Sequence, residues 1–255
     1  MIMKFRYIKL SNILIFLFVS SVIWAQEGTT NETKGNEILK KVDENLMPVS
    51  FESYRKLINE EPDGSKKEFI FYTVKKGKDK VAMLYISPAS EKGRATLRLG
   101  DNMWLYIPNV GRPIRITSMQ SVIGGVFNNS DIMRLDYSVE YEATILDQTP
   151  SEYILDLKAR TQIVAYDKLK MWVDKKNIMV TKVECYAASG TLIKILEFND
   201  VKNFGDGIMR PAVIETSSPL YRDYRSLMIY SSMKHRKLPD EVFTLEYLSR
   251  LGELR

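Results

Sequence analysis

One cysteine and one histidine are present in the chain of 255 residues. A single cysteine cannot form an intramolecular disulfide, so a packed core must stabilise the fold. Cys185 alternates with Val183 and Ala187 in an apolar run, which predicts a small buried side chain rather than a reactive thiol. His235 lies among cations in the segment SSMKHRKLP, which is typical of an exposed loop or strand end. One histidine cannot supply a histidine-rich metal site.

Motifs for nucleotide binding and for serine hydrolases are missing as well. The chain has no GxxxxGK loop, no GxGxxG loop and no GxSxG turn. No basic block with interleaved aromatic residues follows the pattern of a nucleic-acid surface. We therefore predict that the protein binds no nucleic acid.

Four acidic residues cluster within a short stretch: Asp131, Asp136, Glu140 and Glu142. Two carboxylates are enough for a glycosidase. In an extended chain, however, Asp136, Glu140 and Glu142 would share one side and apolar residues such as Tyr141 the other. This alternation predicts a solvated strand face. No residue argues for an enzyme, and we predict neither catalysis nor a cofactor.

Residues 1–25 have the layout of a secretory signal peptide. Three cations and no acid precede the apolar run LSNILIFLFVSSVIW. Ala25, which follows the run, is a small residue suited to cleavage. A retained membrane anchor is the alternative, but the run is short for a span of about 20 apolar residues. Without residues 1–25, 34 of the 37 Lys and Arg residues remain beside 32 acidic residues, so the exported chain is nearly neutral.

The exported chain begins with a polar segment, and the folded domain is expected to start at residue 35. Residues 26–34 are small and polar, which predicts a disordered tail. In residues 36–47, the side chains of Ile38, Leu39, Val42 and Leu46 recur at helical spacing, which predicts an amphipathic helix.

From residue 50 onward the apolar pattern is that of strands. Short turns such as EPDG and KKGKD separate the strand-like segments, and links this short join antiparallel neighbours. A sheet of about ten strands tends to curl and close, which removes its exposed edges. We expect one domain over residues 35–255, with strands at 50–58, 68–76, 80–87, 95–100, 103–107, 138–146, 152–159, 168–173, 178–188 and 191–198.

Residues 117–137 interrupt this pattern with a connection that is too long for a hairpin. Gly124 and Gly125 lie in an apolar run, and the letters NNSD before IMRL predict a helix N-cap. Connections of this length are commonly functional lids, and the segment is too apolar to remain in water. We predict a lid that closes over an apolar space.

The strand at 103–107 is apolar on both sides. Trp104 and Tyr106 face one way, and Leu105 and Ile107 face the other. In a curled sheet, one side can be covered by a helix while the other faces a filled core or a ligand cavity. The predicted lid favours a ligand cavity over a filled core on the inner side.

The segments MWLYIPNVGRPIRI (103–116) and NNSDIMRLDY (128–137) also carry a resemblance. They are similar to the outer-membrane lipoprotein-sorting proteins of the LolA-like class, through Trp104, Tyr106, Pro108, Arg115, Ile116, Ser130 and Asp131. Weaker matches lie at residues 93–94, 166–174 and 186–195.

The resemblance implies a mainly β protein with a few helices, a single-domain unclosed antiparallel β-barrel with a helical or loop lid over an apolar cavity. It implies a periplasmic carrier that takes up acyl chains of lipids or lipoproteins and moves them toward the outer membrane. An inner-membrane transporter, an outer-membrane acceptor and transient membrane contact are the implied partners. Arg98, Arg112 and Arg115 are candidates for an arginine that latches the lid. The expected ligand-binding residues are Trp104, Tyr106, Met119, Val122, Ile123, Val126, Phe127, Ile132, Met133 and Leu135.

Two other functional classes remain open at this point. An adaptor or structural domain of an envelope export complex would share the signal and the strands but have a solid core. An exported hydrolase would need a polar cluster in the cavity, with His235 pointing into it.

Overall fold

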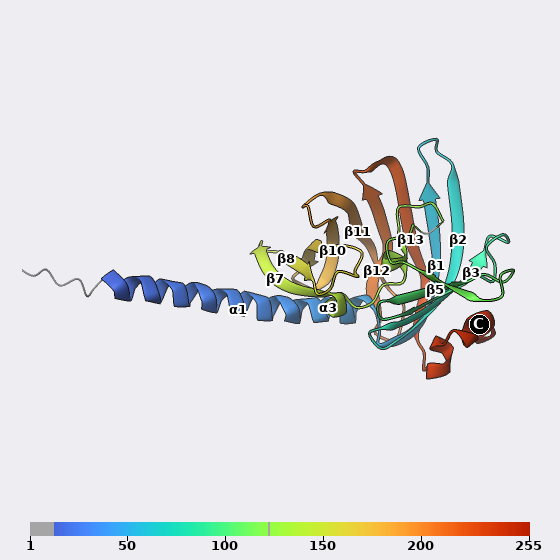
Figure 1. The fold of residues 1–255 in the computed structure, drawn as a ribbon, viewed down its shortest axis with the longest axis horizontal. Helices are drawn as coiled ribbons and strands as arrows, with labels where there is room; N and C mark the ends of the chain where they lie inside the picture. The colour runs from blue at the N-terminus through green and yellow to red at the C-terminus, as the bar shows by residue number, and fades with distance from the viewer. Residues whose placement is uncertain (1–12, 122) are drawn as a thin grey trace, which may run out of the picture.

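A single antiparallel sheet dominates the computed structural model, which describes residues 13–121 and 123–255 (Figure 1). Its thirteen strands are β1 (Ser50–Glu60), β2 (Lys66–Lys76), β3 (Lys80–Ser87), β4 (Ala95–Leu99), β5 (Asn102–Tyr106), β6 (Pro113–Ile116), β7 (Tyr141–Gln148), β8 (Glu152–Ala159), β9 (Lys168–Asp174), β10 (Met179–Tyr186), β11 (Leu192–Asn203), β12 (Met209–Ser218) and β13 (Tyr221–His235). Their order is β6-β5-β4-β3-β2-β1-β13-β12-β11-β10-β9-β8-β7. The sheet does not close, and the predicted unclosed antiparallel architecture is confirmed.

The strand order follows from two meanders that meet in the middle. Strands β1 to β6 run outward on one side and β7 to β13 run inward on the other. Strand β1 then pairs with β13, from Phe51 opposite His235 to Glu60 opposite Arg225. The connection between β6 and β7, residues 117–140, therefore joins the two free edges of the sheet, and we call it the lid segment.

Helix α1 (Ile13–Leu46) lies along β7 and packs onto the sheet with its last turns (Figure 1). The helix predicted at 36–47 is confirmed, with its four apolar residues buried in the core. The helix axis can approach β7 closely because Gly35 has no side chain, and a Cβ there would overlap the Ala143 carbonyl oxygen. Asn36 Oδ1 accepts a 3.0 Å hydrogen bond from the Ala143 N–H, so the helix also covers the β7 edge.

The structure differs from the sequence prediction at the start of this helix. Residues 26–34 were expected to be a disordered tail, but they continue α1 without a break. Helix cooperativity explains the difference, because the segment contains no proline and an already formed helix extends at little further cost. The predicted signal peptide lies partly outside the described residues, because residues 1–12 are not described.

Two short helices interrupt the lid segment, α2 (Asn129–Ile132) and α3 (Tyr137–Glu140). The predicted N-cap is confirmed: the Asn128 side chain accepts from Asp131 N, and the Asp131 side chain accepts from Asn128 N. The strand expected at 138–146 was wrong in its first residues, because Ser138, Val139 and Glu140 belong to α3 and β7 begins at Tyr141.

Other elements pack on both faces of the sheet, on the outer face only over β1 to β5. The inner face carries α1 and the lid segment over a large apolar cluster that includes Leu57, Phe71 and Met171. The outer face carries the C-terminal 3₁₀ helices η1 (Asp240–Phe243) and η2 (Glu246–Leu254), which pack on Tyr72 and Leu97. Among the described residues, no helix has an apolar stretch long enough to cross a membrane.

Candidate functional site

The lid segment fills the interior of the curled sheet with its own apolar side chains. Phe127, Ile132, Met133 and Leu135 are each at most 2% exposed and belong to the inner core cluster. Two small voids beside them have volumes of only about 10 and 20 Å³. The lid therefore occupies the space that an apolar ligand would need.

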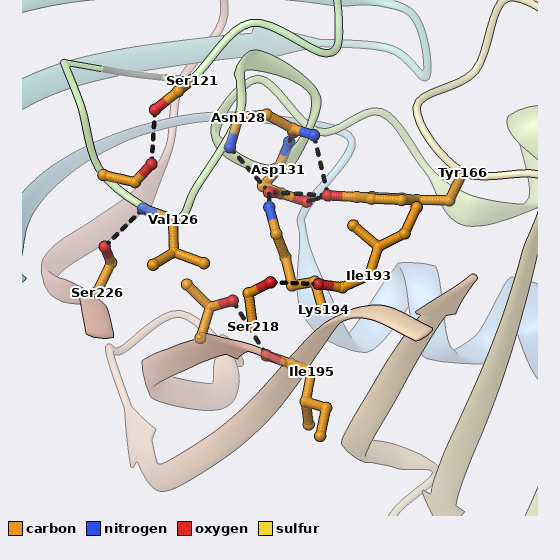
Figure 2. Close-up of polar contacts among 12 residues, drawn as sticks. Ser121, Val126, Asn128, Asp131, Tyr166, Ile193, Lys194, Ile195, Ser218 and Ser226 are labelled. Carbon is orange, nitrogen blue, oxygen red and sulfur yellow. Dashed lines mark hydrogen bonds and ion pairs between the residues drawn. The ribbon is translucent and has the colours of Figure 1, made fainter. Parts of the chain in front are cut away.

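A buried ion pair fixes the middle of the lid segment to β11. Lys194 Nζ lies 2.6 Å from Asp131 Oδ2. The Tyr166 hydroxyl lies 3.1 and 3.2 Å from the two carboxylate oxygens and also accepts a 2.9 Å hydrogen bond from Asn128 Nδ2. Figure 2 shows the Asp131 carboxylate between these groups, with Lys194 reaching it from the strand below. Burial and the nearby Asp131 charge raise the pKa of Tyr166 well above its usual value.

Two more buried ion pairs fix the second half. Lys75 Nζ on β2 lies 2.7 Å from Asp136 Oδ1, and Arg98 on β4 pairs with Glu140. Arg98 Nη1 also donates to the Met133 carbonyl oxygen at 3.2 Å. Arg55 on β1 donates to the Ile132 carbonyl oxygen at 2.9 Å. Cations of the sheet thus bind both the carboxylates of the lid and the buried carbonyl groups of Ile132 and Met133.

Asp43 connects α1 to the same segment. Its two carboxylate oxygens accept hydrogen bonds from the backbone N–H groups of Tyr137 and Ser138, at 2.7 and 2.9 Å. These N–H groups belong to the first turn of α3 and have no hydrogen-bond partner within the helix, so Asp43 satisfies them. Burial raises the pKa of Asp43 to about 6, although the bonds from Ser138 and Tyr137 favour the ionised form.

A tyrosine between guanidinium groups lies next to the lid and the end of α1. Arg210 Nη1 donates to the Leu46 carbonyl oxygen at 2.5 Å, which satisfies the C-terminal turn of α1. Its guanidinium carbon lies 3.7 Å from the centre of the Tyr230 ring, and that of Arg55 lies 5.6 Å away. Burial opposes ionisation of Tyr230, but Arg210, Arg55 and Arg134 outweigh it and lower its pKa to about 7.

An open groove of about 580 Å³ lies between the first half of the lid and the strands β11 to β13. Its lining is largely apolar, and Met119, Leu220 and Tyr221 on it are more than half exposed. Asn128, Tyr166 and Lys194 of the buried ion-pair network also form part of its wall. Near the groove, Val126 N donates a 3.0 Å hydrogen bond to Ser226 Oγ (Figure 2).

Within the described part of the chain, no group of three or more His, Cys, Asp or Glu residues is placed to hold a metal ion. The chemistry that the site offers is burial of apolar chains and pairing of charges.

Comparison with known proteins identifies the family. A family model described as "Uncharacterized protein" matches residues 77–250, and no curated protein matches the chain. A solved structure of a LolA superfamily protein from Nitrosomonas europaea is similar at a TM-score of 0.77 and 32% identity, over 84% of this chain and 98% of that one. The chain belongs to the LolA superfamily.

Two more distant structures share the LolA-like fold. One is described as an outer membrane lipoprotein-sorting protein domain, from Vibrio parahaemolyticus, with a TM-score of 0.75 and 20% identity over 86% of this chain and 100% of that one. The other is a DUF1329 family protein from Desulfovibrio piger, with a TM-score of 0.76 and 21% identity over 86% and 99%.

The residues predicted to line the site of this LolA superfamily protein fall into separate groups. Phe127, Ile132, Met133 and Leu135 lie together in the inner core, and the partly buried Ile123 packs against them. Met119 and Val126 line the open groove instead. Val122 lies outside the described residues.

Trp104 and Tyr106 do not lie with the lid residues. They pack on the outer face with the cluster that η1 and η2 cover, whereas Met103 faces the inner core. The prediction put both residues at the cavity, whereas the structure places them on the outer face. The C-terminal helices that cover this face are too distant in the sequence for a local pattern to reveal the contact. Among the latch candidates, Arg98 contacts the lid, Arg112 is exposed, and Arg115 pairs with the Asn102 side chain.

The acidic residues of the lid were also misjudged in part. Asp136 and Glu140 were expected on a solvated strand face, but each is in a buried ion pair, as is Asp131 of the same acidic cluster. Only Glu142 is exposed as expected, and it pairs with Arg160. Strand parity held part of the missing signal on the side of the cations, because Lys194 shares its parity with Leu196 and Phe198, as an inward-facing side chain would.

Proposed function

We propose that this protein is a carrier of acyl chains, from lipids or from lipoproteins, between membranes of a bacterial envelope. The insertion of the apolar lid side chains into the interior of an unclosed sheet carries the proposal. When the lid leaves, the same apolar surface of the sheet becomes available to an acyl chain. Membership of the LolA superfamily and the fold shared with a lipoprotein-sorting domain support this function.

The energetics suit a carrier that must release its load. Each methylene transferred from water into an apolar interior contributes about 0.8 kcal/mol. Against this gain stands the exposure of Phe127, Ile132, Met133 and Leu135 when the lid opens. The difference between these two terms gives an affinity weak enough for exchange with a membrane.

The proposed location is the periplasm, after removal of residues 1–25. Loading from an inner-membrane transporter and unloading at an outer-membrane acceptor complete the proposed path. The protein binds and releases its load without making or breaking a covalent bond. An intact mass that begins at Gln26 in the exported protein would support this processing, and a mass that includes Met1 would contradict it.

Ligand extraction and titration test the carrier function. Organic extraction of the purified protein followed by mass spectrometry should yield acyl lipids. Titration with a fluorescent fatty acid should saturate at one ligand per chain. An empty extract together with a signal that does not saturate would overturn the proposal.

Hydrogen exchange tests whether the ligand displaces the lid. With ligand bound, the backbone amides of α2 should exchange faster, while those of β4 and β5 under η2 stay unchanged. If the lid amides become better protected instead, the ligand binds with the lid closed.

A further inference from the structure

Charge is distributed unequally between the lid and the sheet. Among the described residues, the buried charged side chains that the strands place on the inner face are all cations: Arg55, Lys75, Arg98, Lys194 and Arg210. The buried carboxylate Glu52 is also on a strand, but it points to the outer face, where it accepts a 2.7 Å hydrogen bond from the Tyr72 hydroxyl.

The carboxylates that balance the inner cations come from the lid. Asp131 pairs with Lys194, Asp136 with Lys75, and Glu140 with Arg98. The acidic side chains of these pairs are 3%, 13% and 7% exposed, so water screens the pairs little. Asp43 on α1 is the remaining buried carboxylate of the described interior, and backbone N–H groups occupy both of its oxygens.

Opening the lid removes these partners at the same time as it removes the apolar side chains. Lys75, Arg98 and Lys194 then face the interior without a carboxylate. A neutral apolar ligand that filled the space would leave buried cations unpaired, which is strongly unfavourable. A ligand with an acidic group can restore the pairing that the lid provided.

We propose that the cargo is an anionic amphiphile, whose phosphate or carboxylate group replaces the lid carboxylates on the inner cations while its acyl chain replaces the lid side chains. This inference rests on the proposed carrier function and specifies the class of its ligand. The lid segment combines acidic and apolar side chains, so it resembles such a ligand in both respects.

The open groove gives the acidic group a route to these cations. Lys194 forms part of the groove wall, together with Asn128 and Tyr166, which hold Asp131 in place. Apolar side chains at the groove, among them Met119 and Leu220, suit the acyl part of the same molecule. An incoming acidic group would meet Lys194 first and compete there with Asp131.

Two ligands of equal chain length and different charge test the inference on the unmodified protein. Hexadecyl phosphate and hexadecanol would each be titrated at neutral pH against a bound fluorescent fatty alcohol. We expect hexadecyl phosphate to bind at least tenfold more tightly. Equal affinities, or tighter binding of the alcohol, would overturn the inference and leave the carrier function standing. Binding of neither ligand would overturn the carrier function itself.

Variants of the two partners separate the roles of sheet and lid. Lys194→Met should lower the ratio of the two affinities at least threefold, because it removes a cation that the phosphate pairs with. Asp131→Asn should change both affinities alike and leave the ratio unchanged. Lys182→Met is the matched control, because Lys182 pairs with Glu184 outside the inner cluster. A ratio that is the same in Lys194→Met and Lys182→Met would contradict the role of the inner cations.

Inorganic phosphate distinguishes an amphiphile from a free anion. At millimolar concentration it should not displace bound hexadecyl phosphate. Displacement would show that the cations form a site for free anions, and the amphiphile would be the wrong ligand class.

Discussion

Lys194 and Asp131 form an ion pair of 2.6 Å across the boundary between sheet and lid, and their side chains are 6% and 3% exposed. The pair joins β11 to the capped first turn of α2. The lid cannot leave the inner face while this contact holds. The ion pair therefore belongs to the equilibrium between the closed and open lid.

Replacing Asp131 with Asn should loosen the lid. The substitution leaves Lys194 buried without a charged partner, which costs about 3 kcal/mol or more. We expect the Met133 amide, which bonds to the Asn129 carbonyl at 2.8 Å, to exchange about a hundredfold faster. Native-state hydrogen exchange measures this. The control Glu253→Gln breaks an exposed pair with Arg250 and should have almost no effect.

A methyl group at Gly125 should hinder lid closure. A Cβ there would overlap the Asn59 side-chain amide, which is buried and held in place because its Oδ1 accepts a 2.8 Å hydrogen bond from the Ser226 hydroxyl. Gly125→Ala should lower the free energy of unfolding by about 1–3 kcal/mol. Urea denaturation measures the free energy of unfolding of Gly125→Ala, of Asn59→Ala and of the double variant. The double variant should be destabilised by about 0.5 kcal/mol or more less than the sum of the two single variants. Strict additivity would show that the two residues do not meet.

Asp43 should make stability fall as the pH rises from about 4 to about 6. Its pKa is raised from 3.8 to about 6 in the folded protein, so in this range the folded state holds a proton that the unfolded state has lost. The effect is on the order of 3 kcal/mol, is absent at lower pH and complete above pH 6. Urea denaturation at several pH values should show this loss in the wild type and not in Asp43→Asn. Glu44→Gln, on the exposed side of the same helix, is the control variant.

Tyr230 should ionise near neutral pH. Its pKa is lowered from 10 to about 7, so absorbance of one tyrosinate should rise between about pH 6 and 8. The signal should disappear in Tyr230→Phe. Because the unfolded chain keeps its proton up to about pH 10, this group adds stability as the pH rises from 7 to 10 and contributes nothing below 7. Arg210→Met should move the titration to higher pH.

Trp104→Ala should affect the outer face alone. Trp104 packs with the cluster under η1 and η2, and its truncation should cost about 1–3 kcal/mol because it is only partly buried. Affinity for an acyl ligand should stay the same. A large loss of affinity with unchanged stability would place Trp104 in the ligand site after all.

Local patterns predicted the elements of this fold well. The helix over 36–47, the N-cap at Asn128 and the succession of antiparallel strands are confirmed. Each depends on side-chain spacing or on a capping residue within a few positions. Cys185 was also correctly predicted as buried, at 1% exposure.

Long-range contacts explain what the sequence did not reveal. Whether Trp104 faces the lid or the C-terminal helices depends on segments more than a hundred residues away. The acidic face of the lid likewise resembles a solvated face until Lys75, Arg98 and Lys194 are brought opposite to it. Three acids and three cations at unrelated positions form a pattern only when the sheet has curled.

The two ends of the lid segment impose a mechanical constraint. It starts from β6 and ends in β7, the opposite free edges of the sheet. A segment tethered at both sides cannot swing on a single hinge as a flap does. It can leave the interior only by bowing outward or by a change in the distance between the two edge strands. Ligand volume inside the sheet is thereby coupled to sheet curvature, and spin labels on β6 and β7 would report loading as a change in their separation.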